Sequence, residues 1–379
     1  MRTKILFASL LIASIQQARA TDRGVGANTL FPTISAALAV SADGDRILLE
    51  AGQYDEFLAL DKDISILSAQ EGTRPTIKGF MRFVSGPSAR KIHFSGVRLL
   101  SYLETIPGSG RLDLSIVDSY VKDKSFNGGN ANLHVVLFRD TLPAGILFHS
   151  GTVIGNVIGG VPNGSSSYLI CSAGTSLPDP LIVIGNIVLP TNDGNNPVYE
   201  IDLTVSSVFH VQNNYLSTPS AIRPFLHIGG SVPFGAAPSS ITNNTFYRSS
   251  PAALTAITAT LNNCNVDIQN NAVIGDTGPL ISWVAPKGTV SNNLYAAPSW
   301  INTSTGQPTL GSPLLNAGHP APRHLDLDLT TNDVGCYGGS NSRANFITPL
   351  GSAVVGFMQA PRVVPQGGAV NISATGFDR

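Results

Sequence analysis

Short apolar stretches on either side of a two-residue polar turn recur through the middle of the chain. The second turn residue is asparagine in six units, in steps of 30, 28, 30, 27 and 22 residues. A period of ~20–50 residues is typical of a solenoid, in which each unit stacks on the one before it. The pattern therefore predicts one strand before and one strand after each turn, coil by coil. The six units are 153–158, 183–188, 211–216, 241–246, 268–273 and 290–295.

The repeated asparagine predicts a particular corner of this solenoid. Asparagine tolerates the left-handed backbone conformation of a sharp turn. Its amide can also hydrogen-bond to the asparagine of the next coil, which satisfies groups that would otherwise be buried and unpaired. We therefore expect one column of side chains along the axis of a parallel β-helix, an all-β fold. The expected members are Asn156, Asn186, Asn214, Asn244, Asn271 and Asn293.

Weaker copies of the unit lie upstream, with turns at Gly96, Ser119 and Asp140. The step from Asp140 to Asn156 is only 16 residues, which is too short for a full coil. Either the coil there is irregular or one of the two matches is false. An antiparallel sandwich would also contain many short strands, but it would not place the same turn at regular steps. A propeller needs ~40 residues per blade, and the steps here are shorter.

The first 20 residues have the pattern of an export signal. Arg2 and Lys4 precede an uncharged, mostly apolar run over 5–15, and residues 18–20 have the small-x-small pattern of a cleavage site. The apolar run is shorter than the ~20 residues of a membrane-spanning helix. No later stretch is long and apolar enough to span a membrane. We therefore expect a protein that is secreted, periplasmic or on the cell surface, and not membrane-spanning.

Both ends of the mature chain resemble a known family. A short amphipathic helix is predicted over 33–40 with Thr33 as its N-cap, and DGDRILLEAGQYDE follows at 43–56. These features resemble the N-terminal cap of the pectate-lyase-like β-helix superfamily, where a helix covers the open end of the solenoid. SPLLNAG at 312–318 and NDVGCYGG at 332–339 resemble closing motifs of secreted bacterial β-helix proteins. The resemblance implies a right-handed parallel β-helix.

The pattern divides the chain into three segments. We expect a signal peptide over 1–20, a parallel β-helix domain over 21–340, and a different C-terminal segment over 341–379. In that last segment the sequence predicts two short strands around a glycine turn within 361–374. The segment is interpreted as a tail on the solenoid or as the truncated start of a β-sandwich.

Charge is scarce in the middle of the chain. Residues 41–140 hold 25 Asp, Glu, Lys or Arg, whereas residues 141–320 hold nine. The formal net charge of −1 leaves no excess of cations to neutralise phosphates, which argues against nucleic-acid binding. The cysteines are too widely spaced for a zinc motif, and we expect isolated core thiols at Cys171, Cys264 and Cys336.

The few charges in the middle include one cluster suited to catalysis. The resemblance implies polysaccharide lyases, pectin esterases and glycosidases as relatives, and these chemistries require carboxylates or basic side chains. Glu200 and Asp202 share one side of a predicted strand over 199–203. Arg223 and Arg248 follow at steps close to one coil. If the protein is an enzyme, we expect Glu200, Asp202, Arg223 and Arg248 to converge in one groove, and otherwise they are solvated loop charges.

Two functions from different classes remain open, so enzyme activity stays undecided. The first is a non-enzymatic surface protein that is structural or binds a polysaccharide or cell-surface glycan. The alternative is a lyase or hydrolase that acts on acidic polysaccharide. Exposed aromatic rings on one face would suit sugar stacking. Most of the aromatic residues could equally belong to the core; the candidates for stacking are Tyr215, Phe246, Trp283, Tyr295 and Trp300.

The sequence predicts a monomer without a cofactor. Calcium is the one ion that the residues could accommodate, because Asp326, Asp328 and Asp333 supply oxygen ligands. Their spacing fits no complete calcium-loop motif. The seven histidines are scattered and show no helical zinc spacing.

Overall fold

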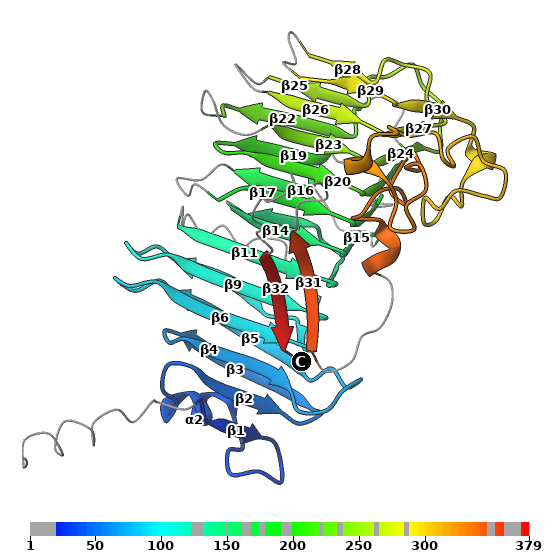
Figure 1. Cartoon of the computed structure of the whole chain (residues 1–379). Helices are drawn as coiled ribbons and strands as arrows, with labels where there is room; N and C mark the ends of the chain where they lie inside the picture. The colour runs from blue at the N-terminus through cyan, green and yellow to red at the C-terminus, as the bar shows by residue number, and fades with distance from the viewer. Residues whose placement is uncertain are drawn as a thin grey trace, which may run out of the picture.

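Parallel strands dominate the computed structural model of the chain (Figure 1). Among the described residues they form three long parallel sheets that wind into a solenoid, which confirms the predicted right-handed parallel β-helix. No helix in the described part is long and apolar enough to cross a membrane. The structure describes residues 20–122, 132–148, 150–160, 168–173, 179–190, 199–219, 223–232, 238–260, 265–283, 288–346, 353–359 and 373–378.

A short helix covers the N-terminal end of the solenoid, as predicted. Helix α2 (Ile34–Ala39) begins after Thr33, whose Oγ1 accepts a hydrogen bond of 3.1 Å from the backbone N of Ala36. Ile34 and Ala37 are buried against the first coils. Glu56 holds the start of the helix, because its Oε1 accepts from the N of Ile34 at 2.8 Å. Except for Ala20, the predicted signal peptide lies outside the described residues.

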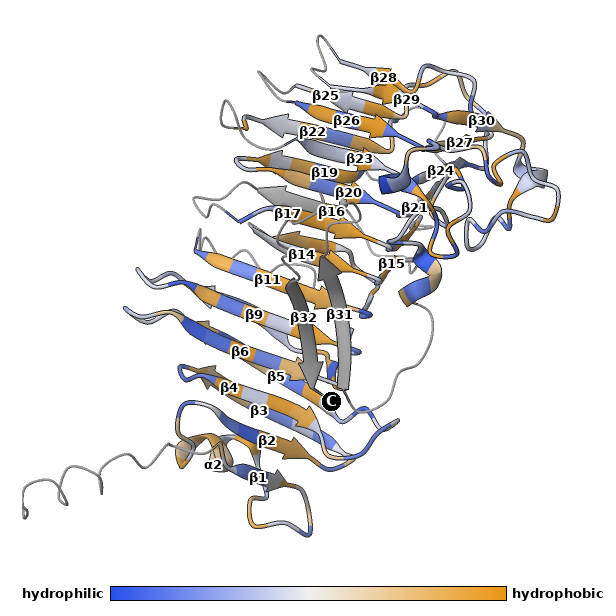
Figure 2. Cartoon of the chain, viewed as in Figure 1, coloured by the Kyte–Doolittle hydropathy of each residue, from blue (hydrophilic) through white to orange (hydrophobic). Residues whose placement is uncertain are grey.

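Sheet 1 contains the strands that precede the asparagine turns, together with strands from the N-terminal coils. Its side chains alternate between the core and the outside, and bands of orange and blue alternate along the strands in Figure 2. In order, the strands are β1 (Asp22–Val25), β2 (Asp45–Leu49), β4 (Ile64–Ser68), β6 (Arg90–Ser95), β9 (Leu112–Val117), β11 (Leu133–Phe138), β14 (Ser150–Ile154), β17 (Leu181–Ile184), β20 (Phe209–Gln212), β23 (Ser239–Thr242), β26 (Val266–Gln269) and β29 (Val290–Ser291).

Sheet 2 contains the strands that follow the turns. Strand β8 (Tyr102–Ile106) pairs with β5 (Thr76–Val84) of this sheet but lies outside the consecutive series of strands. The remaining strands are β3 (Gln53–Leu60), β5 (Thr76–Val84), β7 (Arg98–Leu99), β10 (Tyr120–Val121), β12 (Thr141–Leu142), β15 (Val157–Gly159), β18 (Ile187–Leu189), β21 (Tyr215–Thr218), β24 (Thr245–Arg248), β27 (Ala272–Ile274) and β30 (Leu294–Ala296).

Sheet 3 is described only for the later coils. It completes a three-sided solenoid, and apolar side chains from the three sheets make up most of one continuous core. Its strands are β13 (Ile146–Phe148), β16 (Tyr168–Ala173), β19 (Tyr199–Val205), β22 (Leu226–Gly230), β25 (Ile257–Ala259) and β28 (Ile281–Ser282).

The asparagine column at the corner between sheets 1 and 2 is confirmed. From Asn156 to Asn293, each Nδ2 donates to Oδ1 of the next asparagine at 2.8–3.0 Å. The backbone N of Asp140 donates to Oδ1 of Asn156 at 2.7 Å, so these two residues are neighbours in the column. The turns at Asp140 and Asn156 are therefore both genuine members of the repeat, and the coil between them is irregular. The short step has a physical reason: the chain passes through β12, β13 and β14 with very short connections.

All of the chain after β30, which is called the C-terminal segment from here on, runs back along the outside of the solenoid in its described part. It contains three short 3-10 helices, η1 (Pro298–Trp300), η2 (Pro322–His324) and η3 (Arg343–Phe346), in the described part. An antiparallel pair follows, β31 (Ala353–Gln359) and β32 (Ser373–Asp378), drawn in front of sheet 1 in Figure 1. Of the two strands predicted within 361–374, only residues 373 and 374 are described, and they begin β32. The predicted domain boundaries stay predictions.

An apolar stripe on the outward side of sheet 1 contacts this segment. Its four members are 0–3% exposed although they point away from the core, and Phe346 packs against them. The C-terminal segment therefore contributes to the burial of a face that would otherwise be exposed. The members are Val117, Phe138, Ile154 and Ile184.

Candidate functional site

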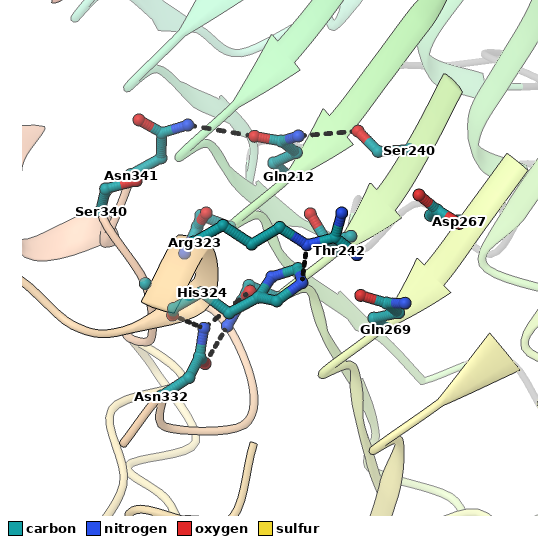
Figure 3. Close-up of a pocket in the computed structure, with 13 residues that line it drawn as sticks. Gln212, Ser240, Thr242, Asp267, Gln269, Arg323, His324, Asn332, Ser340 and Asn341 are labelled. Atoms are coloured by element: carbon teal, nitrogen blue, oxygen red, sulfur yellow. Dashed lines mark hydrogen bonds between the residues drawn. The ribbon is translucent and has the colours of Figure 1, made fainter. Parts of the chain in front are cut away.

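A cleft of about 300 Å³ lies between the outward face of sheet 1 and residues 319–341 (Figure 3). Strands β20, β23 and β26, with the turns that follow them, form its floor, and the returning C-terminal segment forms its wall. The floor residues are Gln212, Asn213, Ser240, Thr242, Asn243, Asp267 and Gln269, and the wall residues are Arg323, His324, Asn332, Gly339, Ser340 and Asn341.

Strand alternation places polar side chains on the floor. Val211, Ile241 and Ile268 point into the core and are 0% exposed, so their sequence neighbours point outward. Parallel pairing aligns these neighbours across coils that lie about 4.8 Å apart. One row holds His210, Ser240 and Asp267, and the second row holds Gln212, Thr242 and Gln269.

In the turns that contain two asparagines, the first asparagine forms hydrogen bonds with the C-terminal segment. Asn213, Asn243 and Asn270 have φ angles of 54°, 55° and 57°, in the left-handed region. Nδ2 of Asn213 donates to the carbonyl of Gly338 at 2.6 Å. The N of His319 donates to Oδ1 of Asn270 at 2.8 Å. Adjacent asparagines therefore have different roles, because the second builds the column while the first binds the returning segment.

Glycine replaces the first asparagine in the two coils before the cleft. Gly155 and Gly185 also have positive φ angles, both 68°. A Cβ atom at Gly155 would lie 2.8 Å from Phe346 Cβ, and one at Gly185 would lie 2.3 Å from its Cδ2. Glycine is therefore needed where the ring of Phe346 lies directly on the turns.

Gln269 is the most unusual residue of the floor. Its side chain is 1% exposed, yet neither Oε1 nor Nε2 has a hydrogen-bond partner among the described residues. Gln212, two coils away in the same row, is satisfied: its Oε1 accepts from Asn341 at 3.0 Å and its Nε2 donates to Ser240 at 2.7 Å. A buried and unpaired amide is costly, which makes Gln269 the first candidate on the floor for contact with a ligand.

The charged groups of the cleft are few and balanced. Oδ1 of Asp267 accepts from the N of Thr289 at 3.1 Å. On the wall, Nε of Arg323 donates to Nε2 of His324 at 2.9 Å. The ring centroids of His324 and His319 are 4.7 Å apart. One arginine therefore faces one carboxylate across the cleft (Figure 3).

Sequence reasoning did not identify this cleft, although one signal was present. The residue before the turn is Gln212, Thr242 or Gln269 in the cleft coils, whereas it is Ile154 or Ile184 in the coils under Phe346. The change from apolar to polar at this position marks the part of sheet 1 that borders the cleft.

Of the four predicted catalytic residues, Glu200 and Arg248 lie near each other and are buried, and Arg248 contacts the backbone of the half-buried Arg223. Arg248 is 0% exposed; its Nε donates to Asp276 at 2.8 Å and its Nη2 donates to the carbonyl of Arg223 at 2.9 Å. Its guanidinium carbon lies 4.6 Å from the ring centroid of Phe225. Glu200 is 2% exposed, and burial raises its pKa to about 8, against the opposing effects of Thr218 and Arg248.

Asp202 belongs to a different arrangement. Its Oδ1 lies 2.8 Å from Nδ1 of His227, the aligned residue of the next strand of sheet 3. The two side chains are 30% and 21% exposed. The spacing of 25 residues between them was the sequence signal for this pair. None of Glu200, Asp202, Arg223 and Arg248 lines the cleft, and their catalytic role stays a prediction.

The three aspartates considered for calcium accept hydrogen bonds within the C-terminal segment. Asp326 accepts from the N atoms of Gly339 and Asp333, and Asp328 accepts from the N of Thr330 at 3.0 Å. Burial is the main cause that raises the pKa of Asp326 and of Asp333. The described residues contain no group of three His, Cys, Asp or Glu that could hold a metal ion. Calcium binding stays a prediction.

Two of the predicted sugar-stacking rings are core residues. Tyr215 and Phe246 are 0% exposed, so sugar stacking is wrong for these two and the core alternative holds: both rings pack among apolar side chains. Tyr295 and Trp300 are 47% and 39% exposed. Of the cysteines, Cys336 is a buried free thiol, and burial raises its pKa to about 11.

The similarity of this chain to known proteins is structural. No protein-family model matches the chain, and no curated protein matches it. A crystal structure of pectate lyase Pel9A is similar, with a TM-score of 0.37 and 13% sequence identity over 84% of this chain and 96% of that chain. The parallel sheets described above establish the fold independently of that similarity.

Proposed function

We propose that this protein binds a glycan in the cleft between sheet 1 and residues 319–341. The observation that carries the proposal is Gln269, a buried amide without a partner among the described residues, on the floor of a polar cleft. A ligand that reaches this amide would supply the hydrogen bonds that the protein itself does not.

The other floor groups suit a sugar. Ser240 and Thr242 present hydroxyl groups on strands of the solenoid, and Asp267 presents a carboxylate. Sugar hydroxyl groups both donate and accept hydrogen bonds, and amides, hydroxyls and carboxylates are their natural partners. Because regular strands hold these groups, the site is largely preorganised for its ligand.

Binding without catalysis fits the lining better than hydrolysis. Among the described lining residues, Asp267 is the only carboxylate. Glycoside hydrolysis commonly uses two carboxyl groups about 5–9.5 Å apart. The proposal therefore describes a monomeric, secreted or surface-located β-helix protein that holds a glycan without cleaving it. A lyase or hydrolase centred on Glu200 and Arg223 is the alternative, and Glu200→Ala and Arg223→Ala would abolish its activity.

The proposal is tested by screening the exported protein on an array of polysaccharides. We expect retention of at least one glycan, and we expect Gln269→Met to abolish it because methionine fills the space without hydrogen bonding. Gln307 is an exposed glutamine outside the cleft, so Gln307→Met is the matched control and should bind normally. Retention of no glycan, or equal retention by Gln269→Met, would contradict the proposal.

A further inference from the structure

The amide of Gln269 restricts the chemistry of its ligand. A glutamine side chain presents a donor, Nε2, beside an acceptor, Oε1. Both atoms are buried and neither has a partner among the described residues. A complementary ligand must therefore present an acceptor and a donor next to each other.

Two neighbouring hydroxyl groups of a sugar meet this requirement. One hydroxyl accepts from Nε2 while the next donates to Oε1, because each hydroxyl can do either. A carboxylate has acceptors only, so one of its oxygens would face Oε1 without a hydrogen between them. An ammonium group has donors only and would leave Nε2 unpaired.

The neighbour of Gln269 on β26 favours the same choice. Asp267 lies two residues earlier on the same outward face, and its Oδ1 accepts from the N of Thr289. A carboxylate accepts hydrogen bonds from hydroxyl groups and repels a second carboxylate. Ser240 and Thr242, which are aligned with Asp267 and Gln269 on the preceding strand β23, are both hydroxyl residues.

The charge across the cleft gives no advantage to an anion. Arg323 on the wall is one cation, and Asp267 on the floor is one anion among the described lining residues. Their formal charges cancel, so the cleft as a whole does not attract a negatively charged sugar over a neutral one.

From these observations we infer that the cleft takes an uncharged sugar, held by two adjacent hydroxyl groups at Gln269, with Asp267 as a neighbouring acceptor. This inference rests on the proposed function and narrows it from glycans in general to neutral hexoses or pentoses. It also separates this site from one built for uronic acids.

The test is calorimetric titration of the exported protein with neutral and acidic trisaccharides of matched length. The probes are maltotriose, cellotriose, mannotriose, xylotriose and trigalacturonate, each at low salt and at about 0.5 M NaCl. We expect at least one neutral probe to bind more tightly than trigalacturonate, with an affinity that salt changes less than about twofold. Gln269→Met should lower that affinity at least about tenfold, and Gln307→Met should not change it.

The outcomes separate the inference from the proposed function. Tighter, salt-sensitive binding of trigalacturonate that depends on Gln269 would overturn the inference and leave glycan binding in the cleft intact. Binding of any probe that is unchanged in Gln269→Met would overturn the cleft as the site. Binding of none of the probes, together with an empty polysaccharide array, would overturn both.

Discussion

Asn341 donates a hydrogen bond of 3.0 Å from Nδ2 to Oε1 of Gln212, although 129 residues separate them in the chain. The bond orients the Gln212 amide, whose Nε2 then donates to Ser240. One residue of the wall thus orders two residues of the floor. Beyond Asn341 the chain reaches Phe346, which packs on the apolar stripe. The C-terminal segment therefore borders the cleft first and then contacts the apolar part of the same sheet.

Gln269 and Gln212 form a matched pair for a stability test. Gln269→Met removes two buried polar atoms without partners among the described residues, so we expect the free energy of unfolding to rise by about 1–2 kcal/mol. Gln212→Met breaks two formed hydrogen bonds and should lower it by about 1–2 kcal/mol. Urea unfolding of both variants measures the effects. A loss of stability in both variants would show that Gln269 is a structural residue.

A substitution in the interior of the asparagine column should lower the free energy of unfolding more than a substitution at its end. Asn214 accepts from Asn186 and donates to Asn244 and to the carbonyl of Val183, and it is 0% exposed. We expect Asn214→Ala to lower the free energy of unfolding by about 2–4 kcal/mol, because it leaves several buried groups unpaired.

Asn293, the last member of the column, is the matched comparison. It accepts from Asn271 and is only half-buried, so Asn293→Ala should cost about 1 kcal/mol. Thermal unfolding of the two variants side by side distinguishes them. Equal losses would mean that the column does not act as a continuous buried network.

Glu200 should make stability depend on pH. Burial raises its pKa from 4.5 to about 8, so between these values the native chain keeps a proton that the unfolded chain has released. This group therefore lowers the free energy of unfolding as pH rises through that window. Glu200→Gln stays neutral, and its stability advantage over the natural protein should grow with pH. Urea titrations at about pH 5, 7 and 9 measure the trend, and parallel profiles would refute it.

Phe346 should anchor the returning segment on the solenoid. Phe346→Ser removes the ring from the stripe of Val117, Phe138, Ile154 and Ile184, and we expect a loss of about 1–2 kcal/mol together with increased binding of an apolar dye. Leu310 is 99% exposed, so Leu310→Ser serves as the control and should change neither property. Unchanged dye binding in Phe346→Ser would show that other residues suffice to cover the stripe.

The repeat pattern was sufficient to predict the solenoid and its asparagine corner. The apolar–turn–apolar unit and the asparagine at its second turn position are local features that repeat with the coil, and parallel stacking brings equal positions into register. For this reason the column from Asn156 to Asn293 could be predicted residue by residue. The N-terminal helix was predictable for a similar reason, because its cap at Thr33 and its apolar face are both local.

The position of the cleft and the pairing of the charged side chains depend on long-range contacts that the repeat pattern does not specify. The cleft exists because residues 319–341 return to coils that lie 49 to 129 residues earlier in the chain, and no periodic signal specifies that contact. Asp202 and Arg223 are nearly one coil apart, yet Asp202 meets His227 because strand register, rather than approximate spacing, selects its neighbour. Arg248 became a buried structural cation because Asp276, one coil later, compensates its charge. Position along the chain predicts which coil a side chain occupies, whereas its partner depends on register and on the segment that covers it.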